Sequence, residues 1–169
     1  MSNYLKSEYL HFDISKNTVI LDSKFMFAFR HFDGFSHRLL NYDLYVDTEY
    51  NFVCYMTAKN VNCISDDINF SLLFESKLPT KIKQSLAILI NDQFNRINKE
   101  YKVETFVATD LGSTHILYNI NNETKSINLY DNIISDPQEF KSKNEKRLLV
   151  LIQLITDWIE NLYNLIAVK

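Results

Sequence analysis

The longest hydrophobic pattern in the chain runs from Asp136 to Ile166. It opens with Asp136-Pro137-Gln138-Glu139, in which aspartate can cap a helix, proline suits its first position and glutamate its third. Apolar residues then recur every three or four positions: Leu148, Leu151, Ile152, Ile155, Ile159, Leu162 and Ile166. Additional apolar residues in the middle turns widen this stripe. We therefore predict a long helix over 136–166 that is buried on several sides and forms the centre of the fold.

The first half of the chain alternates apolar and polar residues, which is typical of β-strands. We expect strands at 4–12, 18–21, 24–32, 35–46, 51–58 and 68–78. Asp33-Gly34 is a signal for a two-residue type I′ turn, and the resulting hairpin would pair Phe32 with Phe35 and Arg30 with His37. One face of this hairpin is apolar and should pack on the long helix: Phe25, Phe27, Phe29, Leu40, Tyr42, Leu44 and Val46.

A second helix is predicted at about 80–100, with Thr80 as its cap. Its buried stripe would be Ile82, Leu86, Leu89, Ile90, Phe94, Ile97 and Tyr101. Three more strands follow at 102–110, 114–121 and 126–131, and their short connections favour antiparallel neighbours. The order of elements predicts a single α+β domain over residues 1–169, in which a mostly antiparallel, meandering sheet packs against the two helices.

The composition excludes several classes of protein. A hydrophobic content of 46% rules out intrinsic disorder. A net charge of −3 without a basic stripe argues against nucleic-acid binding, because phosphate neutralisation needs clustered Lys and Arg. The one basic cluster, between Lys141 and Arg147, is interrupted by Glu145 and is interpreted as a solvated helix face. With two glycines in the whole chain, enzymes built on glycine-rich loops are also disfavoured.

Cellular location and source are indicated as well. Met1 to Leu10 lacks the apolar run of a secretory signal, and the span 148–168 carries too many polar and acidic residues to cross a membrane. Cys54 and Cys63 do not make a disulfide framework, so we expect free thiols and a cytoplasmic protein. Residue types with AT-rich codons are abundant, which indicates an AT-rich bacterial, phage or viral genome.

Polar residues concentrate at the predicted hairpin tip: Arg30, His31, Asp33, His37 and Arg38. In the predicted register His31 and His37 point to opposite faces, so we do not expect them to share a metal ion. We instead expect an anion or a partner to contact Arg30, His37 and Arg38. The acidic residues Asp66, Asp67 and Glu75 have no spacing that requires a cation, and no cofactor is predicted.

The catalytic candidates centre on His115, which follows Asp110, Ser113 and Thr114. A hydrolase would need a serine or cysteine nucleophile to meet this histidine in space. Cys54 lies in an apolar strand and is expected in the core, whereas Cys63 lies in a loop, so a Cys63–His115 dyad is one hypothesis. The chain contains none of the common phosphate-loop, dinucleotide, zinc-protease or nucleophile-elbow motifs, which favours a protein that is not an enzyme.

Tyrosines alternate with carboxylates around the second strand of the predicted hairpin: Tyr42, Asp43, Tyr45, Asp47, Glu49 and Tyr50. Aromatic side chains anchor protein interfaces and acidic groups steer a basic partner, so we predict a partner-binding patch here. The alternative is that these tyrosines fill the face of the sheet.

The leading functional hypothesis is a small cytoplasmic inhibitor that binds a protein. Its most concrete form is an immunity protein that neutralises a bacterial toxin, or a phage inhibitor of a bacterial defence protein, with a partner that is basic. Two alternatives stay open. One is a small enzyme with an unrecognised site around His115 and Cys63 or at the Arg30–Arg38 hairpin tip. The other is a homo-oligomeric structural subunit, for which a homodimer is the simplest form.

Overall fold

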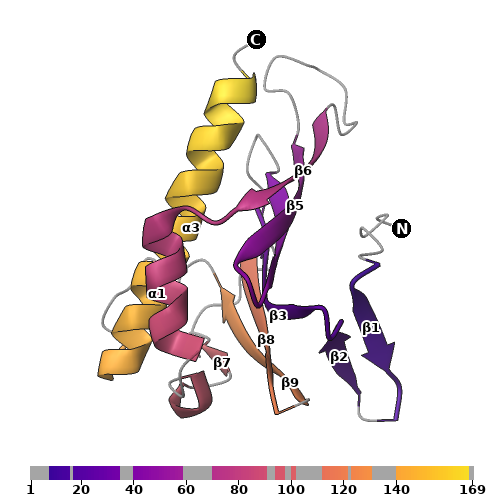
Figure 1. Ribbon diagram of the computed structural model, residues 1–169, viewed down its shortest axis with the longest axis vertical. Helices are drawn as coiled ribbons and strands as arrows, with labels where there is room; N and C mark the ends of the chain where they lie inside the picture. Colours follow the sequence, from indigo (N-terminus) through magenta and orange to yellow (C-terminus); the bar gives the residue numbers. More distant parts are fainter. Residues whose placement is uncertain are drawn as a thin grey trace.

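The computed structural model confirms the α+β fold: the residues that it describes form one seven-stranded sheet, a separate two-stranded ribbon and two α-helices (Figure 1). It describes residues 8–15, 17–34, 40–58, 70–90, 94–97, 100–101, 112–121, 123–130 and 140–167. Its elements are β1 (Leu10–Asp13), β2 (Thr18–Leu21), β3 (Phe25–Phe32), β4 (Asn41–Asp47), β5 (Asn51–Ala58), β6 (Phe70–Lys77), α1 (Thr80–Ile90), η1 (Phe94–Arg96), β7 (Glu100–Tyr101), β8 (Ser113–Ile120), β9 (Glu123–Tyr130) and α3 (Lys143–Ala167).

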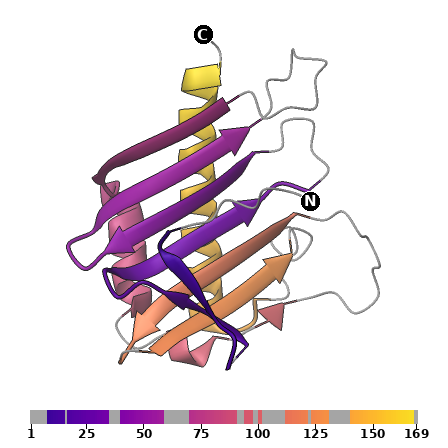
Figure 2. The same cartoon turned by 90° about the vertical axis from the view of Figure 1, so that its right-hand side faces the viewer.

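The strands of the large sheet lie in the order β6-β5-β4-β3-β8-β9-β7. All neighbours are antiparallel except β7, which pairs in parallel with β9 through Glu100 and Tyr101. The helices cover one face, here called the inner face, and the β1–β2 ribbon crosses the opposite, outer face (Figures 1 and 2). The molecule therefore has three layers, with the sheet in the middle.

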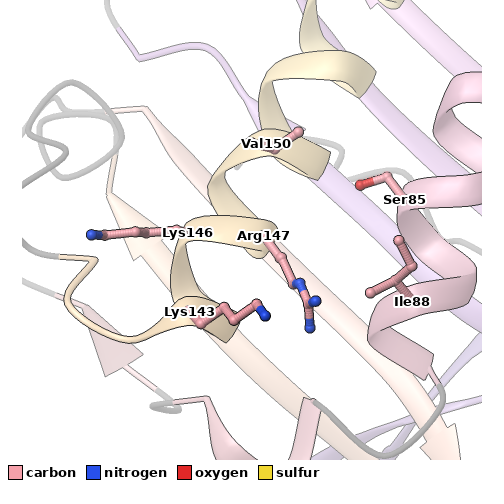
Figure 3. A pocket seen from close by; sticks show the side chains of 6 residues that line it. All are labelled: Ser85, Ile88, Lys143, Lys146, Arg147 and Val150. Carbon is pink, nitrogen blue, oxygen red and sulfur yellow. The ribbon is translucent and has the colours of Figure 1, made fainter.

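The main core lies between the inner face and the helices. The predicted faces of both helices are confirmed over most of their length: the side chains of Ile82, Leu86 and Leu89 in α1, and of Leu148, Leu151, Ile152, Ile155 and Ile159 in α3, are at most 2% exposed. Ile166, the last residue of the predicted stripe in α3, is 36% exposed. Val150, one of the apolar residues that widen the stripe of α3, is 50% exposed, so the helix is open to solvent on this side. The outward sides of α1 and α3 form an open groove (Figure 3).

The long helix begins at Lys143, later than predicted. Phe140 to Ser142 precede it without helical structure, and the predicted cap at Asp136 lies outside the described residues. Ser142 and Glu145 form a capping box: the Glu145 amide donates to Ser142 Oγ at 3.2 Å, and the Ser142 amide donates to Glu145 Oε2 at 2.7 Å. These bonds satisfy amides that no preceding helical turn can reach, which is why the helix can start there.

The register of the β3–β4 hairpin also differs from the prediction. Phe32 pairs with Asn41 and Arg30 with Asp43, so Asp33-Gly34 is not a two-residue turn. Instead the Leu40 amide donates to Asp33 Oδ2 at 3.1 Å, where the paired strands end. The shift is an even number of residues, and side chains alternate with a period of two, so the predicted faces are nearly unchanged. Phe25, beyond an irregularity in β3, is the exception and packs on the outer face.

The second helix ends at Ile90, and the prediction that it continues to residue 100 is wrong. The chain forms the short η1 turn at 94–96 and then β7. Phe94, Ile97 and Tyr101 are nevertheless buried as expected, and the Phe94 ring stacks on Tyr118 with centroids 4.5 Å apart. The apolar period of three to four therefore predicted correctly that these residues are buried, but not the conformation of their backbone.

The β8–β9 hairpin is longer than predicted. Ile120 pairs with Glu123, so two residues connect the strands, and Asn121 adopts the left-handed φ of 52° that such turns need. The predicted loop at 122–125 is thus mostly strand. The predicted strand at 102–110 lies outside the described residues.

Candidate functional site

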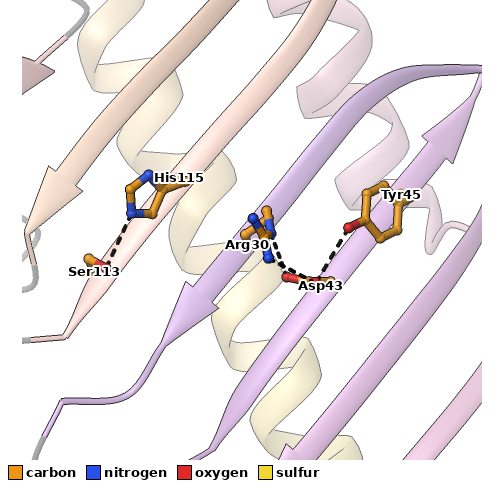
Figure 4. A network of polar contacts seen from close by, with 5 residues as sticks. All are labelled: Arg30, Asp43, Tyr45, Ser113 and His115. Carbon is orange, nitrogen blue, oxygen red and sulfur yellow. Dashed lines mark hydrogen bonds and ion pairs between the residues drawn. The ribbon is translucent and has the colours of Figure 1, made fainter. Parts of the chain in front are cut away.

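A row of polar side chains crosses the outer face of the sheet at its centre. Arg30 on β3 pairs with Asp43 on β4 and with His115 on β8, which in turn pairs with Asn128 on β9. Because each pair is directly cross-strand, the four side chains project from the same face. Figure 4 shows Arg30 and His115 beside each other on neighbouring strands.

Arg30 and Asp43 form an ion pair with two contacts, Nε to Oδ1 at 2.8 Å and Nη2 to Oδ2 at 3.3 Å. The Tyr45 hydroxyl donates to Asp43 Oδ2 at 3.4 Å (Figure 4). Burial acts to lower the pKa of Arg30, but the hydrogen bond and charge of Asp43 outweigh it, and the net pKa is raised. The predicted anion-contact residue Arg30 is therefore already neutralised by a carboxylate within the chain.

His115 is held between two polar side chains. Its Nδ1 lies 2.9 Å from Asn128 Oδ1, and its Nε2 lies 3.3 Å from Ser113 Oγ. An amide oxygen only accepts, so Nδ1 carries the proton and Nε2 can accept the hydrogen of Ser113. Burial lowers the pKa of His115, which favours the neutral ring near pH 7. This places a hydroxyl, a base and an orienting group in the order that nucleophilic catalysis requires.

Of the other residues of the predicted hairpin tip, the structure brings His31 and Asp33 together, with His31 Nε2 3.4 Å from Asp33 Oδ1. His31 faces the helices, where its Nδ1 lies 3.0 Å from Thr114 Oγ1 and its ring stacks on Tyr42. His37 and Arg38 lie outside the described residues, as do Cys63, Asp66 and Asp67. In the described part of the chain, no group of three His, Cys, Asp or Glu side chains is placed to hold a metal ion.

Half of the predicted aromatic and acidic patch is buried. Tyr42, Asp43 and Tyr45 are at most 3% exposed, so the expectation that they lie on the surface is wrong. Tyr42 packs in the main core, where its hydroxyl lies 3.4 Å from Thr156 Oγ1, and burial raises its pKa. The buried aromatic rings fill both sides of β4, which is the alternative that the sequence left open. Cys54 is buried as predicted, and burial raises the pKa of its thiol.

The remaining patch residues, Asp47, Glu49 and Tyr50, form the β4–β5 turn. Asp47 Oδ1 accepts the amides of Glu49 and Asn51, both at 2.9 Å. The Asn51 side-chain amide also donates to Asp47 Oδ2 at 2.9 Å. Burial acts to raise the pKa of Asp47, but this side-chain bond and the two backbone bonds outweigh it, and the net pKa is lowered. Tyr50 has a φ of 64°, a left-handed conformation that is costly for a tyrosine. Glu49 is exposed, and a role for this turn in partner binding stays a prediction.

The β1–β2 ribbon has a buried base and an exposed tip. At the base, Leu10 and Leu21 pack on an outer-face cluster that includes Ala28, Tyr45 and Leu117. The Asn119 side-chain amide also donates to the Phe25 carbonyl at 2.8 Å, and Thr124 Oγ1 accepts the Leu21 amide at 3.0 Å. Towards the tip, apolar side chains are left in solvent: Phe12 is 59% exposed, Ile14 86%, Val19 38% and Ile20 36%.

No protein-family model matches this chain, and no curated protein matches it either. In the described residues, neither helix is both long enough and apolar enough to span a membrane.

Proposed function

We propose that the chain is a small cytoplasmic inhibitor that binds a protein, most concretely an immunity protein for a bacterial toxin or a phage inhibitor of a defence protein. The observation that carries the proposal is the exposed apolar tip of the β1–β2 ribbon. Phe12 and Val19 are direct cross-strand neighbours and continue the face by which Leu10 and Leu21 pack on the sheet. Solvent-exposed apolar side chains grouped on one projecting element favour a protein interface.

The polar groups of the outer face also favour binding over turnover. Arg30 is neutralised by Asp43, and both ring nitrogens of His115 have partners in the chain. An inhibitor needs complementary shape and an apolar anchor more than it needs free reactive groups. The exposed carboxylate of Glu49 can steer a basic partner towards the molecule.

The test is co-expression with the product of a neighbouring gene that is toxic to the host cell. The wild-type chain is expected to restore growth and to co-purify with that product. Phe12→Asp should abolish both effects, since it places a charge at the centre of the proposed interface, without changing the melting temperature. Leu165→Asp is the matched control, because Leu165 is 71% exposed but lies on α3. Glu49→Lys should weaken binding to a basic partner, mainly at low salt.

Failure of every adjacent gene product to bind would contradict the proposal. A homodimer in light scattering that Phe12→Asp converts to a monomer would favour the structural-subunit alternative instead.

A second candidate function, acyl transfer, is favoured by the Ser113–His115–Asn128 arrangement. Ser113 Oγ would attack a carbonyl carbon while its proton moves to His115 Nε2. The intermediate would then collapse by releasing an alcohol or amine that takes this proton, and water would hydrolyse the remaining ester by the same route. Phe32, whose ring meets His115 edge-on at 6.3 Å, and Tyr130, paired with Ser113, would flank the substrate.

Labelling with a fluorophosphonate tests this candidate directly. Covalent modification seen by intact mass should disappear in Ser113→Ala and in His115→Ala. It should persist in Ser126→Ala, the matched control, because Ser126 is exposed on the same face of β9. An unlabelled wild-type chain would contradict an acyl-transfer site.

A further inference from the structure

The groove between α1 and α3 has an apolar floor and a basic rim. Ile88 on α1 and Val150 on α3 form the floor, and each is about half exposed, at 49% and 50%. Lys143, Lys146 and Arg147 lie along the α3 side, and Lys143 and Arg147 project towards α1 (Figure 3). The groove has a volume of about 690 Å³, within the range of about 300–1,000 Å³ that is usual for ligand sites.

The charge of the groove is the opposite of the charge of the chain. The net charge is −3, yet the groove is lined by Lys143, Lys146 and Arg147, and α1 on its other side carries no acidic residue. On α3 the only nearby carboxylate, Glu145, is buried and accepts hydrogen bonds from Ser142 and Tyr101. Among the described residues, Lys143, Lys146 and Arg147 form no ion pair. Within this part of the chain, Lys143 and Arg147, which project towards α1, are therefore available to pair with a ligand (Figure 3), and the amino end of α3 adds to the positive potential.

From this geometry we infer that the groove binds an acidic peptide segment of a partner protein, with one apolar side chain seated between Ile88 and Val150. Carboxylates on either side of that anchor would pair with Lys143 and Arg147. A small inorganic anion would leave the apolar floor in solvent, and a flat bilayer would not fill the concave groove. An extended or helical peptide segment can contact both the apolar floor and the basic rim, as in other helix-lined grooves.

This inference is independent of the proposed inhibitor function, because the groove and the β1–β2 ribbon lie on opposite sides of the sheet (Figure 1). The groove lies on the helical side, and Phe12 lies on the ribbon side. A variant of one surface should therefore leave binding at the other unchanged.

The experiment is a selection of random 12-residue peptides displayed on phage against the purified full chain. Enriched peptides are expected to combine Asp or Glu with a Leu, Phe or Ile anchor. Affinity of the best synthetic peptide should fall about tenfold or more in Lys143→Glu/Arg147→Glu, since two attractions become repulsions. The matched control is Lys24→Glu/Lys77→Glu, which changes the net charge equally, in the β2–β3 connection and on β6, and should leave the affinity within about twofold.

A third variant tests the apolar floor. Val150→Asp should weaken binding of the same peptide about tenfold. The helical circular dichroism of the variant chain should stay unchanged, because Val150 is half exposed. The inference is overturned if no peptide is enriched, if the enriched peptides are basic or neutral, or if the two charge-reversed variants bind equally. It is also overturned if phosphatidylglycerol vesicles, and not peptides, bind in a manner that depends on Lys143 and Arg147.

Discussion

The inner face of the sheet is filled by aliphatic and aromatic side chains, whereas the outer face carries an ion pair, a histidine and a small apolar cluster under the ribbon. On the inner face Phe27, Phe29 and Leu44 are fully buried beneath α1 and α3. On the outer face, Arg30 and Asp43, which adjoin Phe29 and Leu44 on the same strands, contact each other. The same strands therefore provide stability on one side and specific polar geometry on the other, because their side chains alternate.

This difference predicts which substitutions should lower the free energy of unfolding most. The stabilisation from burying apolar surface is proportional to the buried area and changes little when side chains shift slightly. The inner face should therefore contribute most to the free energy of unfolding. The outer face depends on partner groups that must be present together. Its residues should show strong coupling between pairs, with smaller single contributions.

The largest effect is expected for Leu151→Ala on α3. Leu151 is fully buried against the inner face, and truncation should lower the free energy of unfolding by about 3 kcal/mol through lost burial and a cavity. Urea unfolding measures this change. Val150→Ala, one residue earlier and half exposed, should change it by less than about 0.5 kcal/mol. Equal costs at the two positions would show that α3 is not anchored by its inner side.

A somewhat smaller loss is expected for Asp43→Leu, which leaves the Arg30 charge without its partner. Breaking a buried pair costs about 3–5 kcal/mol, and the Arg30 side chain is 18% exposed, so we expect about 2 kcal/mol. Arg30→Met/Asp43→Leu should recover at least half of this loss, because no charge is then left buried. A double variant as unstable as the sum of its single variants would contradict the coupling of the outer face.

The next largest effect is expected at the start of α3, the longer of the two described helices that cover the inner face. Ser142→Ala removes the hydroxyl that accepts the Glu145 amide, and should cost about 1 kcal/mol in urea unfolding. Ser142→Asp should restore most of that stability, since aspartate also caps helices. An unchanged stability in Ser142→Ala would mean that the cap contributes nothing.

The smallest effect concerns the pH dependence of the outer face. The folded pKa of His115 lies below the usual value of 6.5, because burial disfavours its charged form. Between these two pKa values the unfolded chain binds more protons, so stability is full above pH 6.5 and falls as the pH drops through this window. His115→Gln should flatten the dependence between pH 7.5 and pH 5. Titration of the ring by NMR checks the direction, and a raised pKa would contradict it.

The sequence predicted the apolar framework better than it predicted boundaries. The period of three to four identified the buried side of α3, and alternation identified the faces of β3 and β4 despite a wrong register. The start of the long helix was misplaced: it was predicted from Asp136-Pro137, whereas the capping box of Ser142 and Glu145 precedes the observed start at Lys143. When two cap signals follow each other closely in a sequence, local patterns do not indicate at which of them a given helix begins.

The candidate site was predicted only in part. His115 and Arg30 were singled out from their residue types, but Asn128 was missed because only strand register brings it to His115. Asp43 was assigned to a surface patch, whereas it is buried with Arg30. Partners on β3, β4, β8 and β9 are separated in sequence, and the observed hairpin register pairs Arg30 with Asp43 instead of the predicted His37. The opposite charges of Arg30 and Asp43 were compatible with an ion pair, but their spacing in the sequence did not indicate that the two residues are paired.

The position of β3 at the middle of the sheet has a consequence for folding kinetics. On one side β3 pairs with β4, its neighbour in sequence, and β3 to β6 form a continuous meander. On the other side Phe29 pairs with Ile116, so this seam joins early and late parts of the chain. Closing such a long loop is entropically costly before any contact is made. We therefore expect the meander to form early and docking of β8 on β3 to limit the rate, as in other folds of high contact order.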